Sequence, residues 1–400
     1  MIRNLRGITW NHPRGLSPLV ACAREHLSRT GVEVEWLTRS LQGFADAPLP
    51  ELAREFDLVV FDHPHLGEVA ESGAFLPIAD HVDPSELLQW RDSAGPSYES
   101  YLDEVGQLWG VPIDAAGTVA AWRPDLLAKT GVPAPATWLE YLATSRAATK
   151  LGRFVAIPLL PIDALTALMT LLANRGTPPS LDIEFAPQDA LVEELERLRE
   201  LSAASHSMSL TSSPLEILDR MSTSSDLMYA PLIFGYSNYA RSGFRTHSVE
   251  FGAFPSAYST SAGGTLGGAG IGISRTSDRA IDALGFARFV GSTVIQQTTY
   301  VENDGQPASR AAWTSDHANR LTNNYFRHTL PLMEQQYLRP RYAGYLQVQG
   351  LAGRVIHDFL SGKGTAEVTA KSLNIIVDES HTTGVQRHSG RLRQGEELDE

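Results

Sequence analysis

The chain has 400 residues, of which 42% are hydrophobic and 20% are charged, and its formal net charge at pH 7 is −13. This is the composition of a globular protein, and the length suggests a hydrophobic core large enough for two or three domains. The negative net charge disfavours a protein that binds nucleic acid or anionic membranes non-specifically. The lone cysteine, Cys22, excludes an internal disulfide and a multi-cysteine zinc site, and no segment approaches the ~20 apolar residues that span a bilayer.

Strand and helix patterns alternate over the first hundred residues. A strand is predicted over 5–10, and Ser17 followed by Pro18 predicts the start of a helix after the polar turn NHPRG. Further strands are predicted over 32–37 and 57–61. The apolar core of the last one, LVVF, is continuous, which is typical of a parallel sheet covered by helices on both faces. This order predicts an α/β fold of the doubly wound kind.

Polar side chains follow the first and third predicted strands. His12 and Arg14 come after the first strand, and Asp62, His63 and His65 come after the third. These two strands are often neighbours, and ligands bind outside the carboxyl ends of the strands in such sheets. We therefore expect both groups at one rim of a ligand cleft. Local turn chemistry or helix capping is the alternative role, in particular for Asp62.

The pattern changes after residue 108. An extended segment runs through VPIDAAG, and helices are predicted near 137–149, 162–174 and 190–201. A strand then leads into the aromatic loop FGYSNYAR, and the glycine-rich stretch GGTLGGAGIGIS returns to strand. Two helices and the loop NDGQPASRAAW are predicted next. The remainder to about residue 373 is predicted to be helical, and a polar tail follows.

In these pieces and their order the chain resembles bacterial extracellular solute-binding proteins of carbohydrate-type ABC importers, the maltose-binding-like branch. The segments that resemble the family span most of residues 3–375, and none of them is a catalytic signature. They are FDLVVFDHPHLGEVAESGAFLPI, LWGVPIDAAGTVAAWRPDLLAKTGVPAPATWLEYL, GGTLGGAGIGISRTSDRAIDALGFARFVGSTVIQQ, GQPASRAAWTSD and RPRYAGYLQVQGLAGRVIHDFLSGKGTAEVTAKSLN.

The resemblance implies a two-lobed fold of the periplasmic-binding-protein type II, in which each lobe is a mixed sheet flanked by helices and the ligand lies in the cleft between them. It implies an N-terminal lobe of residues 1–112 with 263–312, a C-terminal lobe of residues 113–262 with 313–378, and a polar tail over 379–400. Family members are normally exported with a signal peptide or a lipobox cysteine. The sequence as written shows neither.

Several further residues are candidates for ligand contact. Asp114, where the first crossing strand is expected, could accept two hydroxyl groups or pair with a cation, or it could make a hinge hydrogen bond. Tyr236, Asn238 and Tyr239 form an aromatic and polar cluster that suits stacking on a sugar face. Trp122 could be a stacking platform, although a place in the core is the favoured alternative.

The glycines and arginines of the predicted cleft suggest other contacts. Gly267 and Gly268 precede and enter a strand, so they do not match the dinucleotide-binding fingerprint, and we expect them to let the backbone approach the ligand. Arg14 and Arg310 could bind an anionic ligand group through two hydrogen bonds. Either arginine could instead form an ion pair at the surface.

The histidines raise the possibility of metal binding or catalysis. His12, His63 and His65 with Asp62 carry ligand types that suit zinc or iron, but their spacing fits no metal-binding signature, so we expect no metal and no cofactor. As catalytic groups, His12, Asp62 and His63 would supply general acid and base functions. The sequence contains no known catalytic motif. This does not exclude catalysis, because the residues of a catalytic triad come together in space and need not form a motif in the sequence.

Three functions therefore compete. The first is a monomeric binding protein for a sugar, polyol or organic acid that serves an ABC importer permease, with no nucleic-acid partner and no membrane span. The second is a cytoplasmic enzyme on the same scaffold, and the third is a cytoplasmic ligand sensor. The sequence as written predicts a cytoplasmic protein, or a periplasmic or extracellular one if it is a processed mature form.

Overall fold

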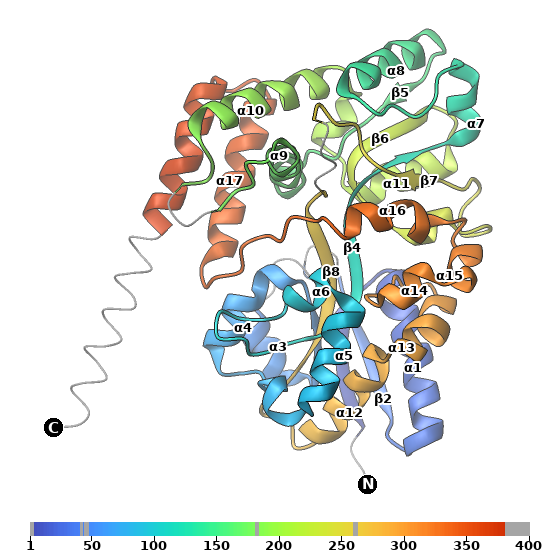
Figure 1. Ribbon diagram of the computed structural model, residues 1–400, viewed down its shortest axis with the longest axis vertical. Helices are drawn as coiled ribbons and strands as arrows, with labels where there is room; N and C mark the ends of the chain where they lie inside the picture. The colour runs from blue at the N-terminus through green and yellow to red at the C-terminus, as the bar shows by residue number, and fades with distance from the viewer. Residues whose placement is uncertain (1–3, 41–42, 44–47, 181–183, 259–262, 381–400) are drawn as a thin grey trace, which may run out of the picture.

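The computed structural model describes residues 4–40, 43, 48–180, 184–258 and 263–380, and Figure 1 shows two lobes joined by long strands. The predicted polar tail, 379–400, lies almost entirely outside the described residues. Among the described residues, no helix is long and apolar enough to cross a membrane.

One continuous sheet runs through both lobes, in the strand order β2-β1-β3-β8-β4-β6-β5, with β7 paired to β4. The pairs β2–β1, β1–β3 and β5–β6 are parallel, and the pairs that involve β8 or β4 are antiparallel. The strands are β1 (Leu5–Trp10), β2 (Val34–Arg39), β3 (Leu58–Phe61), β4 (Val111–Trp122), β5 (Phe154–Val155), β6 (Leu227–Phe234), β7 (Glu250–Gly252) and β8 (Leu266–Ile273). The predicted neighbourhood of the first and third strands is confirmed.

Two separate hydrophobic cores define the two lobes. The first core takes residues between Leu5 and Ile113 and between Ala269 and Tyr300, whereas the second takes residues between Ala115 and Leu266 and between Val301 and Val377. Strands β4 and β8 contribute to both cores, so they are the crossing strands between the lobes (Figure 1). The change of core on β4 falls between Ile113 and Ala115, at Asp114.

Helices cover the sheet in both lobes (Figure 1). In the first lobe they are α1 (Pro13–Thr30), α3 (Leu49–Glu55), α4 (Leu66–Ser72), α5 (Pro84–Ala94), α6 (Pro96–Glu99), α12 (Ala280–Gly291) and α13 (Thr293–Ile295). In the second they are α7 (Pro124–Leu127), α8 (Trp138–Lys150), α9 (Pro161–Arg175), α10 (Gln188–Ala203), α11 (Pro214–Thr223), α14 (Arg310–Thr314), α15 (Asp316–Leu321), α16 (Tyr325–Met333) and α17 (Tyr345–Leu360), with a last helix over 366–380.

The first helix begins earlier than its sequence predicts. The expected start at Ser17 is wrong, because α1 begins at Pro13 and His12 is its N-cap. The His12 Nδ1 atom accepts a hydrogen bond of 3.1 Å from the backbone N–H of Arg14, and Pro13 occupies the first helical position, where its missing N–H costs nothing. The helix ends at Thr30, and its C-cap Gly31 has a φ of +75°, the left-handed conformation that glycine adopts without strain. Arg14 is therefore held rigidly in the first turn of a helix.

Candidate functional site

A buried ion pair joins the start of α1 to the crossing strand β4. The guanidinium of Arg14 donates to both carboxylate oxygens of Asp114, at 2.8 and 2.5 Å, and to the carbonyl oxygen of Gly235 at 3.1 Å. Arg14 is only 4% exposed and Asp114 only 1%. Burial opposes the charged form of Arg14, but the Asp114 carboxylate more than compensates and raises the pKa of the guanidinium. The pair ties the first lobe to the crossing strand and to the loop after β6.

A second charged pair lies at the end of β3. The Asp62 carboxylate accepts from Arg339 at 2.8 Å and lies 3.0 Å from Nδ1 of His63. Burial acts against ionisation of Asp62, yet Arg339 and His63 lower the pKa of this carboxyl group. Burial lowers the pKa of His63 to about 4, so its ring is neutral at pH 7. Arg339 belongs to the segment between α16 and α17, so this pair also crosses between the chain's two cores.

A third acidic side chain, Asp163, has no such partner. It occupies the first turn of α9, which begins at Pro161, and it keeps partial solvent access. Within the described part of the chain it makes no ion pair or side-chain hydrogen bond. Burial raises the pKa of Asp163 to about 7. The sequence analysis did not single out Asp163, because acidic residues are common in the first turn of a helix, where they interact favourably with the helix dipole.

Tyr236 brings these groups into one site. Its ring lies 4.5 Å below the guanidinium carbon of Arg14. Burial raises the pKa of the Tyr236 phenol, Arg14 opposes this shift, and the carboxyl groups of Asp114, Asp163 and Asp62 add to it. We call this set the inter-lobe cluster; it consists of Arg14, Asp62, Asp114, Asp163, Tyr236 and Arg339.

Buried polar atoms without partners surround the inter-lobe cluster. The hydroxyl of Tyr345, Nε2 of His63 and the side-chain amide of Gln336 are enclosed, and none of them has a hydrogen-bond partner among the described residues. Tyr345 and His63 both interact electrostatically with Asp62 and Arg339, and Gln336 packs directly on the crossing strand at Gly117. Unpaired buried polar atoms are costly. Their presence beside two charge pairs is typical of a site that is completed by a ligand or by water.

Two predicted histidines have local partners. His12 caps α1 through Nδ1, and its ring meets that of Tyr236 edge-on at 5.2 Å between ring centres. Burial lowers the pKa of His12 to about 4. His65 is buried, with Nδ1 at 3.6 Å from a carboxylate oxygen of Glu68. Among the described residues no group of three or more His, Cys, Asp or Glu side chains could hold a metal ion.

The predicted aromatic and amide candidates are divided between the cluster and the second core. Tyr236 belongs to the cluster, whereas Tyr239 is buried and donates to Asp219 at 3.0 Å. Asn238 donates to the carbonyl oxygen of Asp304 at 3.1 Å. The Trp122 indole donates to Glu250 at 3.1 Å and stacks on Tyr229, which places it at the edge of the second core.

The predicted glycines serve the crossing of the strands. A side chain at Gly268 would lie 2.3 Å from the carbonyl oxygen of Asp114, and one at Gly267 would lie 2.8 Å from the ring of Phe234. The φ of Gly268 is +136°. These glycines thus let β8 approach β4 and β6 closely.

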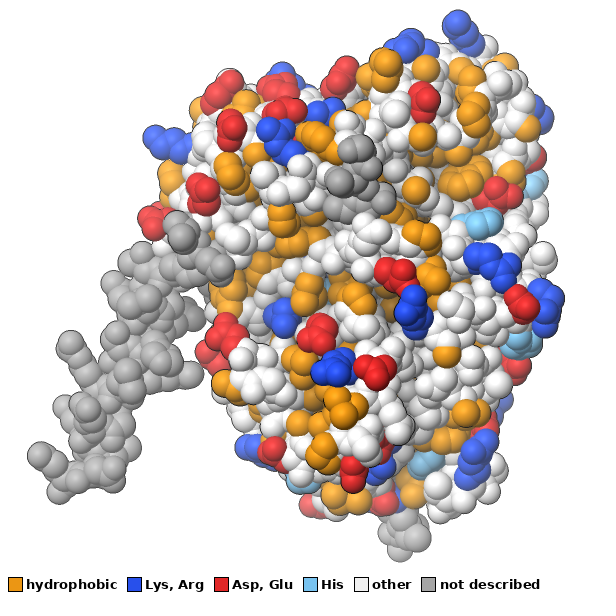
Figure 2. All heavy atoms as spheres, viewed as in Figure 1, with side chains coloured by type: hydrophobic (Ala, Val, Ile, Leu, Met, Phe, Trp, Pro, Cys, Tyr) orange, Lys and Arg blue, Asp and Glu red, His pale blue; other side chains and the backbone are white. Residues whose placement is uncertain are grey.

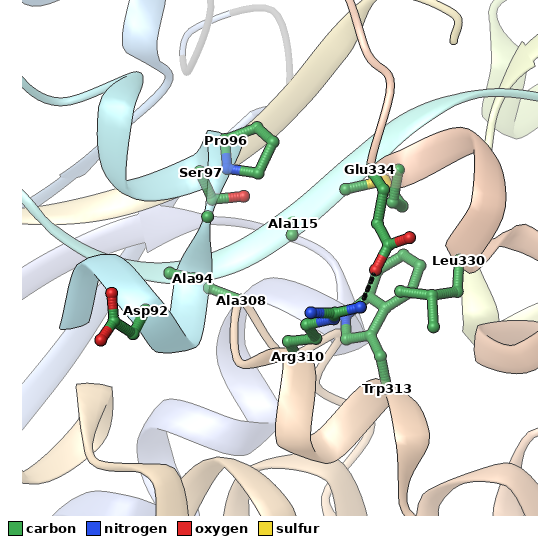
Figure 3. Close-up of a pocket in the computed structure, with 12 residues that line it drawn as sticks. Asp92, Ala94, Pro96, Ser97, Ala115, Ala308, Arg310, Trp313, Leu330 and Glu334 are labelled. Carbon is green, nitrogen blue, oxygen red and sulfur yellow. Dashed lines mark ion pairs between the residues drawn. The ribbon is translucent and has the colours of Figure 1, made fainter. Parts of the chain in front are cut away.

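Arg310 lies in a pocket of about 310 Å³ between α5 and α6 of the first lobe and α14 and α16 of the second (Figure 3). It forms an exposed ion pair with Glu334. Ala115 of β4 lines this pocket, and consecutive strand residues face opposite sides. The pocket therefore lies on the other face of β4 from Asp114 and the inter-lobe cluster.

A larger pocket of about 600 Å³ adjoins the cluster itself. Its wall includes Arg339, the partner of Asp62, together with residues of α4, of the loop at 102–105 and of the segment between α16 and α17. Hydrophobic side chains are exposed along the junction of the two lobes on the face shown in Figure 2. Arg339 thus links the inter-lobe cluster to an adjacent open space.

Comparisons with known proteins identify the family and the fold. The sequence profile described as bacterial extracellular solute-binding protein matches residues 25–316. No curated protein sequence matches the chain. The fold is similar to that of maltose-bound MalE3 of T. maritima, with a TM-score of 0.81 and 17% identity over 95% of this chain and 99% of that one.

Two further solved structures have the same fold. The solute-binding protein of Agrobacterium radiobacter K84 in complex with ribitol has a TM-score of 0.78 and 17% identity over 95% of this chain and 98% of that one. The solute-binding protein of Thermotoga lettingae TMO bound with α-D-tagatose has a TM-score of 0.77 and 17% identity over 94% of this chain and 99% of that one.

Proposed function

Because the chain belongs to the bacterial extracellular solute-binding proteins, we propose that it is the substrate-binding component of an ABC importer and closes its lobes around a sugar or polyol. The inter-lobe cluster is the proposed binding site. Its members come from α1, the end of β3, the crossing strand β4, α9, the loop after β6 and the segment before α17. A solute held by these groups would contact both lobes and so favour the closed arrangement.

The charge pairs support an uncharged or hydroxyl-rich solute over an organic acid. Arg14 and Arg339 are each neutralised by a carboxylate, at Asp114 and Asp62. An anionic ligand would have to displace one of these buried pairs and leave a carboxylate without its partner, which is costly. Hydroxyl groups can instead accept from and donate to the polar atoms that lack partners in the cluster.

The bound solutes of similar structures point in the same direction. The three structures named above carry maltose, ribitol and α-D-tagatose. A sugar or polyol importer further implies a membrane permease as partner and a place outside the cytoplasm, in keeping with the family's extracellular description. We also propose that the chain acts as a monomer.

The two cores bear on the predicted lobe boundaries. We propose lobes of residues 1–112 with 263–312 and of residues 113–262 with 313–378. The switch of core at Asp114 on β4 and between Leu266 and Ala269 on β8 supports the boundaries near 112 and 263. Val301 and Ala308 pack in the second core, as α14 does through Trp313, so the end of the segment 263–312 lies against the second lobe.

A thermal-shift screen followed by titration calorimetry tests the proposed function. Sugars, polyols and organic acids are offered separately, and each bound compound is recovered and analysed. Binding of a sugar or polyol that is recovered unchanged supports the proposal. Binding of organic acids alone would contradict it, and a compound consumed during incubation would favour the enzyme built on His12, Asp62 and His63.

A further inference from the structure

A short segment of the second lobe, residues 339–343, lies directly against the first lobe. It belongs to the connection from α16 to α17, which runs between the two lobes (Figure 1). At its start, the guanidinium of Arg339 donates to the carboxylate of Asp62, at the end of β3, over 2.8 Å. The two side chains are only 5% and 24% exposed. We call residues 339–343 the inter-lobe strap.

The rest of the inter-lobe strap contacts the first lobe through Arg341 and through its backbone. Nε of Arg341 donates to the carbonyl oxygen of Leu102, which packs against the first core, at 3.1 Å. The strap also passes so close to α4 that a Cβ atom at Gly67 would lie 2.2 Å from the backbone nitrogen of Ala343. The inter-lobe strap thus makes an ion pair, a hydrogen bond and a backbone contact with the first lobe.

The inter-lobe strap is itself anchored in the second lobe. Arg339 also donates to the carbonyl oxygen of Leu266 and to the side-chain oxygen of Gln349, each at 3.3 Å. Leu266 packs in the second core, and its backbone N–H donates to the carbonyl oxygen of Tyr337 at 2.8 Å. Gln349 belongs to α17, which also packs in the second core. A movement that separates the lobes at this point therefore breaks the contacts of the strap with the first lobe and keeps its contacts with the second.

We propose that the inter-lobe strap holds the lobes together before a solute binds, mainly through the ion pair of Arg339 and Asp62. The affinity for the solute then depends on this contact, because a site formed by both lobes is complete only in the fraction of chains whose lobes are together. The effect on affinity rests on the proposed function. The effect on the lobes themselves does not depend on which solute binds.

Distances between two spin labels, measured by double electron–electron resonance on the full chain, test the inference. The labels are attached at exposed positions of the two lobes, through Gln89→Cys on α5 and Lys150→Cys on α8. Cys22 is buried and therefore protected from labelling. Each protein is measured alone and with maltose, ribitol or D-tagatose.

Two variants disturb the strap in different ways, and each has a matched control. Asp62→Asn removes the negative charge of the pair with little change of shape, and Asp358→Asn does the same to the exposed pair with Lys363. Gly67→Ala adds a methyl group for which the strap leaves no room, whereas Gly285→Ala adds one in open space. Gly67 is not part of the inter-lobe cluster, so this variant leaves the proposed solute contacts in place. Circular dichroism establishes that each variant is folded.

We expect short distances to predominate in the unmodified chain without sugar. Asp62→Asn should lower the ratio of short to long distances by about tenfold or more, the loss that accompanies a broken hydrogen bond between charged groups. Gly67→Ala should lower this ratio as well, and both controls should match the unmodified chain. For a sugar or polyol that binds, Gly67→Ala should raise the Kd measured by calorimetry by the factor by which it lowers the fraction of short distances.

Long distances in the unmodified chain without sugar, or an unchanged distribution in Asp62→Asn, would overturn the inference. A sugar that then shortens the distances would leave the proposed function standing. If the variants lengthen the distances as expected but no sugar or polyol of the thermal-shift screen binds, the role of the strap is supported and the proposed function is contradicted.

Discussion

The ion pair of Arg14 and Asp114 makes a prediction at the scale of single residues. Asp114→Asn keeps the shape of the side chain but leaves a guanidinium that is 4% exposed without its counter-charge. We expect the free energy of unfolding to fall by about 3–5 kcal/mol, as for other broken buried pairs. Urea unfolding followed by circular dichroism measures the change.

The matched control is the surface pair of Lys363 and Asp358, whose side chains are 71% and 53% exposed. Asp358→Asn should change the free energy of unfolding by less than about 1 kcal/mol, because water screens exposed pairs. Equal losses for the two variants would show that the buried pair has no special role in the fold.

Asp163 makes a second prediction, on stability and pH. Its pKa of about 7 in the folded chain lies above the ordinary value of 3.8. The folded state therefore holds a proton that the unfolded state releases between pH 4 and 7, and Asp163 destabilises the fold increasingly as pH rises through this window. In the absence of ligand, Asp163→Asn should raise Tm at pH 8 and leave it nearly unchanged at pH 4.

Differential scanning calorimetry at pH 4 to 8 tests this prediction. The histidines titrate in both proteins, so their contribution cancels in the difference between the variant and the unmodified chain. A difference in Tm that is the same at both ends of the pH range would contradict the shifted pKa of Asp163.

The same residues show what sequence can and cannot predict about the site. The polar side chains after β1 and β3 were predicted from their position alone, and they do lie at the ends of these strands. Their pairings depend on segments 100 and 277 residues away along the chain. No local sequence pattern predicts such pairings. Apart from its charge, nothing in the sequence around Arg339 indicated that it would pair with Asp62.

At the scale of elements, the close approach of β8 to β4 makes a prediction for Gly268. A methyl group there would meet the carbonyl oxygen of Asp114 at 2.3 Å, and φ is +136°. Gly268→Ala should therefore destabilise the chain by more than about 1 kcal/mol. Gly285, within α12, has open space around it, so Gly285→Ala should stabilise by roughly 0.5–1 kcal/mol. Changes of the same sign in urea unfolding would contradict this account of the strand crossing.

The start of α1 gives another prediction at this scale. His12→Ala removes the side-chain acceptor that caps the helix and should cost ~1 kcal/mol, whereas His12→Asn keeps an acceptor and should cost less. Chemical unfolding of the two variants makes the comparison. Equal losses would mean that the cap contributes little. Sequence placed this helix start at Ser17, because histidine is an uncommon cap and Pro18 resembles a first-turn proline.

At the scale of the whole molecule, the two lobes and their crossing strands were predictable because the order of segments carries that information. The continuous apolar run of β3 and the glycine-rich β8 lie where the predicted architecture needs them. Which residues near the lobe boundaries pack in which of the two cores was not predictable. Val301 and Ala308 pack in the second core through contacts distant in sequence.

The arrangement of the site predicts how the molecule responds to its solute. Because the cluster draws residues from both lobes, a bound sugar or polyol should hold the lobes together. Small-angle X-ray scattering should give a radius of gyration that falls or stays the same on saturation with ligand. An increase would contradict closure around the inter-lobe cluster.

The most direct test of the central claim is a crystal structure with the tightest-binding sugar or polyol. We predict electron density for the ligand between the lobes, in contact with members of the inter-lobe cluster and bounded by the first turn of α9. Density confined to the pocket beside Arg310, on the other face of β4, would contradict the assignment of the binding site.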